Sequence, residues 1–377
     1  MPFAMAATLF YIITKIELSN QTSQRHTKKM GQAVLGSQNE QLKEIMESLP
    51  KGPSQNKPLV LSVDGAMISL VKKTWVEVRT LVVGTVSEGK KGDPAKQEVK
   101  TVELSKFSRL SDAETFTYEA TLETHRRGVD QAPRVAFVTD GAEWINTFID
   151  TQANEAVRIL DFVHASEYVS KIGRIVIAAE LFPGWLNQRL HQLKEEGADK
   201  LLLELNDLVG AAQPNGELST ALNYLQKRQD RMQYHIYRQQ GWPIGSGMVE
   251  SANKTVVQAR LKGAGMHWER TSVNPMLALR NLIVNDRWEE GCQQRVAYHY
   301  AQIDQRFEKR AKSNELKKGI SPESADTLTQ AAPAVAVLEK PAEPLRVKPK
   351  LVVNGRPTQA HPWRNRVVAL TIKPNLN

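Results

Sequence analysis

The order of strand-like and helix-like patterns between residues 59 and 163 constrains the fold more than any other feature of the sequence. Runs rich in Val, Leu, Ile and Thr predict strands over residues 59–64, 75–86, 101–107, 134–139 and 157–163. Ser111, with Glu114 three residues later, has the spacing of a capping box and predicts a helix to about Arg126. A second helix is expected over residues 142–153. Three consecutive strands, then strands alternating with helices, indicate a five-stranded mixed sheet with flanking helices in an α/β fold.

The chain changes character after this region. Residues 166–240 are rich in Leu, Gln, Lys and Glu, which predicts an all-helical insertion of three or four helices, with breaks near Pro183 and Pro214. Further helices are expected to begin after Gly247 and at Asn274, where the following proline suits a first helical turn. The predicted divisions are a leader (1–57), the first part of the sheet domain (58–165), the insertion (166–242), the second part of the sheet domain (243–300) and a tail (301–377).

The two ends of the chain look less ordered than its middle. Residues 1–18 contain an apolar stretch without a basic start or a cleavage site, and it is too short to span a bilayer comfortably. We expect a helix or an ill-defined start there rather than a targeting segment. Residues 19–57 are polar and are expected to form a linker with one helix around residues 38–48. Beyond about Lys318 the chain is rich in Pro and Ala, which is typical of a flexible tail.

The charge of the chain favours a polyanionic partner. The net charge is +9 and the isoelectric point is about 9.4, and nucleic acid is the commonest partner of such a protein. Residues 301–377 carry 14 Lys and Arg against 7 Asp and Glu, so the tail is either a solvated terminus or a DNA contact. The single cysteine, Cys292, excludes a disulfide framework and a cysteine-rich zinc finger within this chain, and it fits a reducing cytoplasm.

Two aspartates share the same sequence context. Asp64 and Asp140 are each expected to end a strand, and each is followed by Gly-Ala. Taken alone, Asp-Gly suits a hairpin turn. However, Asp140 precedes a predicted helix and not a returning strand, so a hairpin explains it poorly. Neighbouring strands lie about 4.8 Å apart, so carboxylates at adjacent strand ends can share one ion.

A third acid, Glu250, stands in the first turns of the helix expected after Ser246, a reasonable N-cap. It either complements the helix dipole or completes a cation site. Mg²⁺ prefers oxygen ligands and leaves room for phosphate oxygens. Two such ions can activate an attacking hydroxyl and stabilise the leaving oxygen of a phosphodiester. The spacing alone does not decide between these roles.

Several segments together resemble one known family. SVDGAMI, VTDGAEWI, DFVH, the run from Gly241 to Trp268 and VNPMLALRNLIVNDRW are similar to the ISKra-type bacterial insertion-sequence transposases, which belong to the DDE superfamily. The similarity covers about residues 58–290. It implies an RNase H-like catalytic core in which Asp64, Asp140 and Glu250 hold two Mg²⁺ ions, with Mn²⁺ as a substitute. It also implies cleavage and strand transfer at the ends of an insertion sequence.

The resemblance carries further expectations about partners and location. The partner is expected to be double-stranded DNA, both the terminal inverted repeats and the target, bound by a homodimer or higher oligomer. The protein is expected in the bacterial cytoplasm, associated with the nucleoid, with no membrane contact. The stretch between the second and third acids would be the insertion domain of related transposases.

Other residues are candidates for positioning DNA. Asp161 and His164 resemble the (Cys/Asp)-x-x-His motif of such enzymes, although a buried strand-end pair has the same spacing. Basic and aromatic side chains follow Glu250 and either contact DNA or belong to a solvated helix face and to the core. These are Lys254, Arg260, Lys262, His267 and Trp268.

Two other functions remain open at this stage. A nuclease or resolvase on the same fold would hydrolyse DNA without joining it. A truncated or domesticated protein would bind DNA without cutting it, and the sequence contains no N-terminal DNA-binding module that we recognise.

Overall fold

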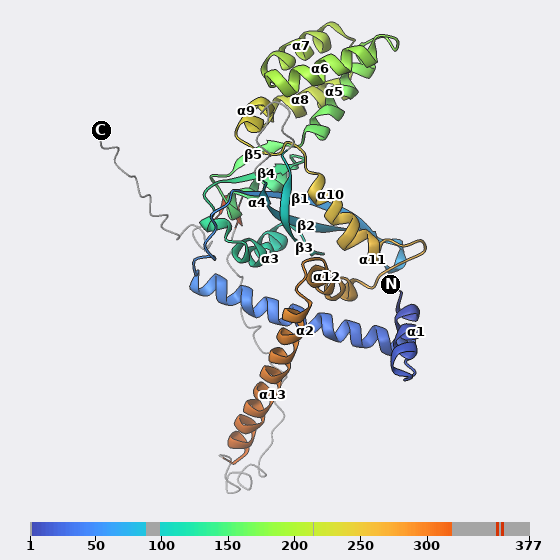
Figure 1. The fold of residues 1–377 in the computed structure, drawn as a ribbon, viewed down its shortest axis with the longest axis vertical. Helices are drawn as coiled ribbons and strands as arrows, with labels where there is room; N and C mark the ends of the chain where they lie inside the picture. The colour runs from blue at the N-terminus through green and yellow to red at the C-terminus, as the bar shows by residue number, and fades with distance from the viewer. Residues whose placement is uncertain (1, 88–98, 214, 319–351, 354–355, 358–377) are drawn as a thin grey trace, which may run out of the picture.

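A mixed five-stranded sheet forms the centre of the protein (Figure 1). The computed structural model describes residues 2–87, 99–213, 215–318, 352–353 and 356–357. The strands are β1 (Leu59–Ser69), β2 (Trp75–Val86), β3 (Thr101–Arg109), β4 (Val135–Thr139) and β5 (Val157–Leu160). They lie in the order β3-β2-β1-β4-β5, with β1, β2 and β3 antiparallel and β4 and β5 parallel to β1. The predicted α/β class and the number of strands in this sheet are confirmed.

The first strand is longer than expected. β1 pairs with β2 along its whole length, from Leu59 opposite Thr85 to Ser69 opposite Trp75. The strand therefore continues past Asp64, which was expected to end it. The prediction of a strand end was wrong because the antiparallel partner supplies hydrogen bonds on both sides of Asp64, whereas Asp-Gly suggested a turn.

Helices cover both faces of the sheet. On one face lie α3 (Ala113–Arg126) and α4 (Glu143–Gln152), where Phe116 and Phe148 are fully buried against Phe137 of β4. The N-cap of α3 is Asp112, whose carboxylate accepts from the Thr115 amide, and not the expected Ser111. The end of the helix at Arg126 is as predicted.

The opposite face carries the insertion and the last helices of the domain. The helices α5 (Phe162–Val176), α6 (Phe182–Glu196), α7 (Asp199–Ala211), α8 (Gly216–Gln226) and α9 (Tyr234–Gln239) form a cluster beyond the end of the sheet that bears β4 and β5 (Figure 1). The described part of 166–240 has no strand, so the predicted all-helical character is confirmed. Strand β5 stops at Leu160, three residues earlier than predicted, because α5 begins at Phe162.

One continuous helical rod follows the insertion and lies across β1 and β2. It consists of α10 (Gly247–Ala252), the π-helical segment η5 (Asn253–Gln258) and α11 (Ala259–Leu261). Val249 and Ala252 pack on Val82 of β2, while Val256 and Val257 pack with Ile68 of β1. The start after Gly245 and Ser246 agrees with the prediction.

The helix α12 (Arg270–Val284) begins earlier than expected and contains Pro275 in its interior. The prediction of a start at Asn274 was wrong because tertiary contacts outweigh the preference of proline for a first turn. The Asn274 side chain donates to the Leu110 carbonyl at 3.1 Å and accepts from its amide at 2.7 Å, which fastens the helix to the end of β3.

The leader is part of the folded body. It contains α1 (Phe3–Thr14) and α2 (Asn20–Ser48), so the single helix expected around residues 38–48 is much longer. α2 packs against α12, and at Gly31 an added Cβ would lie 2.2 Å from the Pro275 carbonyl oxygen. Its Val34 and Leu42 are buried. A linker prediction failed here because α2 has sparse apolar residues and gains its stability from packing.

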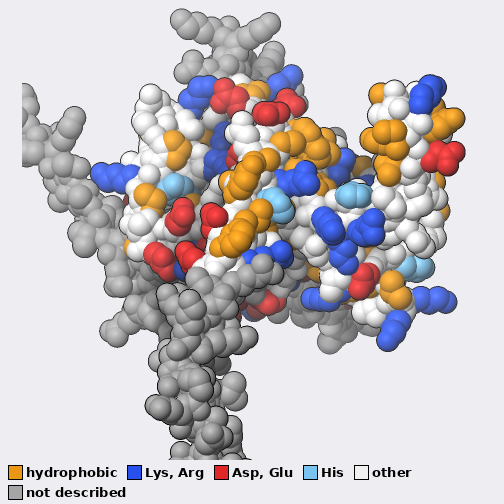
Figure 2. All heavy atoms as spheres, turned by 90° about the horizontal axis from the view of Figure 1, so that it is seen from below, with side chains coloured by type: hydrophobic (Ala, Val, Ile, Leu, Met, Phe, Trp, Pro, Cys, Tyr) orange, Lys and Arg blue, Asp and Glu red, His pale blue; other side chains and the backbone are white. Residues whose placement is uncertain are grey.

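The first helix is mostly exposed. Met5, Ile12 and Ile13 of α1 are each more than half exposed, whereas Ala7 is buried. Figure 2 shows a group of hydrophobic side chains at the right-hand end of the lower face, where Figure 1 places α1. None of the described helices is both long enough and apolar enough to pass through a membrane.

The end of the domain extends into the region that was expected to be a tail. α13 (Trp288–Lys318) carries residues 301–318, which are therefore helical. Residues 352–353 and 356–357 form the short strands β6 and β7. The rest of the predicted flexible tail beyond Lys318 lies outside the described residues.

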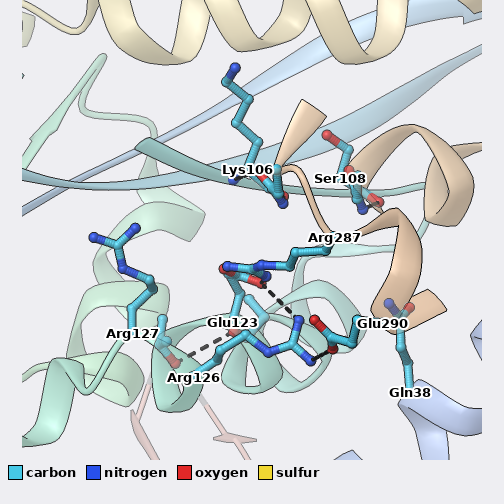
Figure 3. Close-up of polar contacts among 12 residues, drawn as sticks. Gln38, Lys106, Ser108, Glu123, Arg126, Arg127, Arg287 and Glu290 are labelled. Atoms are coloured by element: carbon cyan, nitrogen blue, oxygen red, sulfur yellow. Dashed lines mark hydrogen bonds and ion pairs between the residues drawn. The ribbon is translucent and has the colours of Figure 1, made fainter. Parts of the chain in front are cut away.

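A cluster of charged side chains ties α3 to the start of α13 (Figure 3). Glu123 is only 3% exposed and accepts from both terminal nitrogens of Arg287, at 2.8 and 2.9 Å. Arg126, one turn further along α3, bonds Glu290 at 2.6 Å. The carboxylate of Glu123 raises the pKa of Arg287 against the opposing effect of burial. This cluster joins the two halves of the sheet domain, which the insertion separates in sequence.

We predict that Glu123→Gln lowers the free energy of unfolding by about 2–3 kcal/mol, because it leaves Arg287 in a partly buried position without the carboxylate that binds both of its terminal nitrogens. The loss is smaller than for a fully buried pair, since Arg287 keeps some hydration. Urea unfolding measures the change. Glu47→Gln is the matched control, because its pair with Lys43 is exposed and worth less than about 1 kcal/mol. Equal effects of the two substitutions would contradict the prediction.

Candidate functional site

The register of β1 and β4 brings two of the predicted acids level with each other, one in β1 and one directly after β4. β1 and β4 pair in parallel with Leu59 opposite Val135, Val60 opposite Ala136 and Leu61 opposite Phe137. The same offset, continued by three residues, puts Asp64 level with Asp140. Side chains two residues apart share a face of a strand, so Asp64 lies on the face of Val60. Asp140, which follows β4 directly, continues the face of Val138 and Ala136.

Asp64 is half-buried and held by two donors. Its Oδ1 accepts from the Gly65 amide at 2.7 Å and its Oδ2 accepts from the side-chain amide of Asn253 at 2.8 Å. Burial raises the pKa of Asp64 above its ordinary value of 3.8, and the negative charge of Asp140 adds to this rise. The two hydrogen bonds and the nearby His164 offset part of it. The two carboxylates are therefore close enough to repel each other.

The loop that carries Asp140 is fixed through its backbone. The carboxylate Oδ1 of Asp140 accepts from the Ala142 amide at 3.0 Å, and its carbonyl oxygen accepts from the Tyr224 hydroxyl. The Gly141 carbonyl accepts from Arg228 Nε at 3.0 Å and Nη2 at 2.6 Å. Gly141 has a φ of +76°, so glycine is needed here for a left-handed backbone and not for a hairpin.

Glu250, the third predicted acid, does not form one group with Asp64 and Asp140. Glu250 lies on α10 and is exposed. Asn253, one helical turn later on the same rod, is the residue that reaches Asp64. Within the described part of the chain, no three or more His, Cys, Asp or Glu side chains are grouped so that they could hold a metal ion.

The chemistry of the pair still fits one divalent cation. Asp64 and Asp140 supply carboxylate oxygens, which Mg²⁺ prefers, and a cation between them would offset their repulsion. The amide of Asn253 occupies one lone pair of Asp64 Oδ2 and orients the group. The two-ion set implied by the resemblance requires Glu250 in addition, and in this arrangement Glu250 does not take part.

The two residues of the Asp-x-x-His motif have different surroundings. Asp161 is 3% exposed and caps α5, accepting from the amides of His164 at 2.9 Å and Ser246 at 2.5 Å. It therefore ties the start of the insertion to the loop that leads into α10. His164 is half-buried, and it is near enough to Asp64 to lower the pKa of that carboxylate.

The basic and aromatic candidates after Glu250 divide into two groups. Lys254 and Lys262 are exposed. Arg260 is only 8% exposed, with its guanidinium 5.0 Å from the ring centre of Trp268, which is itself 7% exposed. Both residues pack in the core, which was the alternative left open for Trp268, whereas the solvated helix face considered for Arg260 does not agree with its burial. His267 is exposed and its Nδ1 lies 2.7 Å from Ser69 Oγ.

Sequence reasoning missed three residues that contact the acids or the loop of Asp140. Asn253 could have been found, because it follows Glu250 by three residues and thus shares its side of a helix. Tyr224 and Arg228 gave no such signal, since more than eighty residues separate them from Asp140.

Comparison with known proteins adds no identification. No protein-family model matches the chain, and no curated protein matches it significantly.

Asp64→Asn tests the electrostatic cost of the acid pair in the absence of divalent cations. Because the folded-state pKa of Asp64 is raised, its stabilising contribution is present below the ordinary value and is lost as pH rises through the folded-state value. The unfolding free energy of the wild type should therefore fall relative to that of Asp64→Asn as pH rises past the ordinary value of 3.8 and through the raised folded-state value. Urea unfolding at several pH values measures this difference.

The exposed substitution Glu47→Gln should give a difference from the wild type that hardly changes with pH. The prediction fails if the difference in unfolding free energy between the wild type and Asp64→Asn does not change with pH. It also fails if that difference moves in favour of the wild type as pH rises. Either result would show that the surroundings of Asp64 do not raise its pKa.

Proposed function

We propose that this chain is a DNA transposase of the DDE type, with an RNase H-like core that cleaves phosphodiesters with divalent metal ions and transfers strands. The observation that carries the proposal is the pair Asp64 and Asp140. They stand level on one face of the sheet, and their charges are close enough that Asp140 raises the pKa of Asp64. Close carboxylates on one face of neighbouring parallel strands are suited to hold a cation and seldom serve packing.

The architecture supports the proposal. A mixed five-stranded sheet with helices on both faces agrees with the RNase H-like core that the sequence resemblance implies. The all-helical region α5 to α9 lies in sequence between Asp140 and Glu250, as expected for an insertion domain. The net charge of +9 favours double-stranded DNA as the partner.

In this proposal the protein's own groups have separate tasks. Asp64 and Asp140 bind the metal, which when bound activates the attacking hydroxyl and stabilises the leaving oxygen. His164 lies beside Asp64 and can contact the DNA strand near the reacting phosphate. The exposed Lys254 and Lys262 follow on the same rod and can contact flanking phosphates. Glu250 must turn toward the pair when ions and DNA bind.

One observation favours a second candidate function. Because Glu250 is exposed and apart from the acid pair, the chain could bind DNA without cutting it. A nuclease that cleaves without joining needs the same three acids, and only its products distinguish it from a transposase.

We predict that Asp64→Asn, Asp140→Asn and Glu250→Gln each reduce cleavage to the level seen without metal and leave DNA binding largely unchanged. An amide keeps the shape of the side chain but loses the charge that holds Mg²⁺. Nicking and joining of a plasmid that carries the DNA flanking the gene is measured with Mg²⁺ or Mn²⁺. Glu143→Gln is the control, an exposed acid three residues beyond Asp140 that should retain activity.

Each outcome assigns a role. Near wild-type cleavage by Glu250→Gln would remove Glu250 from the site. Cleavage without joined products would identify a nuclease. DNA binding without cleavage by the wild type, with either ion, would establish the second candidate function.

A further inference from the structure

The helical insertion contacts the loop that carries Asp140. Tyr224, in the last turn of α8, donates its hydroxyl hydrogen to the Asp140 carbonyl oxygen. Arg228, just after α8, donates from Nε and Nη2 to the Gly141 carbonyl oxygen at 3.0 and 2.6 Å. β4 ends at Thr139, so these carbonyl groups lie beyond the strand, and the two side chains supply their donors.

The two donors are themselves held in place by stacked side chains. The ring of Tyr224 lies parallel to that of Tyr168 on α5, with ring centres 3.7 Å apart and an interplanar angle of 5°. The Arg228 guanidinium lies 3.9 Å from the ring centre of Tyr224. Lys171 covers the outer side of Tyr168, with Nζ 4.5 Å from its ring centre. Two side chains of α5, one of α8 and one from just after α8 thus form one stack, which leaves the Tyr224 hydroxyl little freedom.

The Tyr224 hydroxyl is the donor in this hydrogen bond, because the Asp140 carbonyl oxygen can only accept. Gly141 is also closed in by the stack, because an added Cβ would lie 2.6 Å from Arg228 Nε.

We propose that Tyr224 and Arg228 are positioning residues for the metal site, so that the insertion is a working part of that site. This inference rests on the proposed function, in which Asp140 is a metal ligand. The carboxylate of Asp140 is oriented by its own loop, and that loop is held in place by Tyr224 and Arg228. Groups that orient a metal ligand typically change metal affinity by about 10–100-fold when removed.

The test compares two tyrosines of the same insertion. Tyr224→Phe removes the hydroxyl and keeps the ring in the stack. Tyr237→Phe is the matched control, since its hydroxyl donates to backbone carbonyls of Asp230 at 2.8 Å and Arg158 at 3.4 Å, away from Asp140. Mn²⁺ binding to the full chain without DNA is measured by electron paramagnetic resonance of the free ion. Urea midpoints report folding.

We expect Tyr224→Phe to weaken Mn²⁺ binding about 10-fold or more. Tyr237→Phe should keep the wild-type affinity, although both substitutions remove a hydrogen bond and lower the urea midpoint by similar amounts. Arg228→Lys, which keeps the charge but loses the two-nitrogen contact with Gly141, should weaken Mn²⁺ binding in the same direction. A merely structural role would move the urea midpoint and not the Mn²⁺ affinity.

The inference is overturned if Tyr224→Phe binds Mn²⁺ as the wild type does, if Tyr237→Phe loses as much affinity, or if the wild type binds no Mn²⁺. Failure of the proposed function looks different. A wild type that binds Mn²⁺, loses it in Tyr224→Phe and yet cuts no DNA would leave the positioning role standing and remove the transposase. A wild type that cuts DNA while Tyr224→Phe binds Mn²⁺ normally would remove the positioning role and leave the proposed function standing.

Discussion

The short parallel pairing between β1 and β4 is the constraint on which the candidate site depends. Only three residue pairs form it, from Leu59 opposite Val135 to Leu61 opposite Phe137. A slip by one residue would turn every side chain of one strand to the other face, placing Val138 where Phe137 packs against Phe148. The buried aromatic residues on one face therefore fix the level at which Asp64 and Asp140 meet on the other. Packing and chemistry are set by the same register.

Much of the fold was predictable because its sheet elements have strong local patterns. The alternating, β-branched run of β2 gave its bounds correctly, and the insertion was recognised by its helix-forming composition. Elements that depend on distant partners were missed. α2 has few apolar residues and two glycines, and it is ordered by contact with α12 and α13. Pro275 lies inside α12 because the side chain of Asn274 anchors that turn to Leu110.

The sequence revealed only those site residues whose type and whose place after a strand pattern both stood out. Asp64 and Asp140 stood out because each follows a buried strand pattern and precedes Gly-Ala. The structure explains the two glycines differently: Gly65 continues an extended strand, whereas Gly141 has a left-handed backbone. Residues that hold the acids from outside the sheet have no local signature, because their contact with the loop exists only after the insertion has packed.

The π-helical segment η5 has a consequence for the direction in which Glu250 points. A π-helix winds more slowly than an α-helix, so this six-residue segment contains about one residue more than an α-helix of the same number of turns. Rewinding η5 to α geometry with α11 held in place would turn α10 by roughly one residue step, about 100°. Val249 and Ala252 would then lose their packing contact with Val82. The direction of Glu250 thus depends on how η5 is wound, and a small apolar contact with β2 opposes the change.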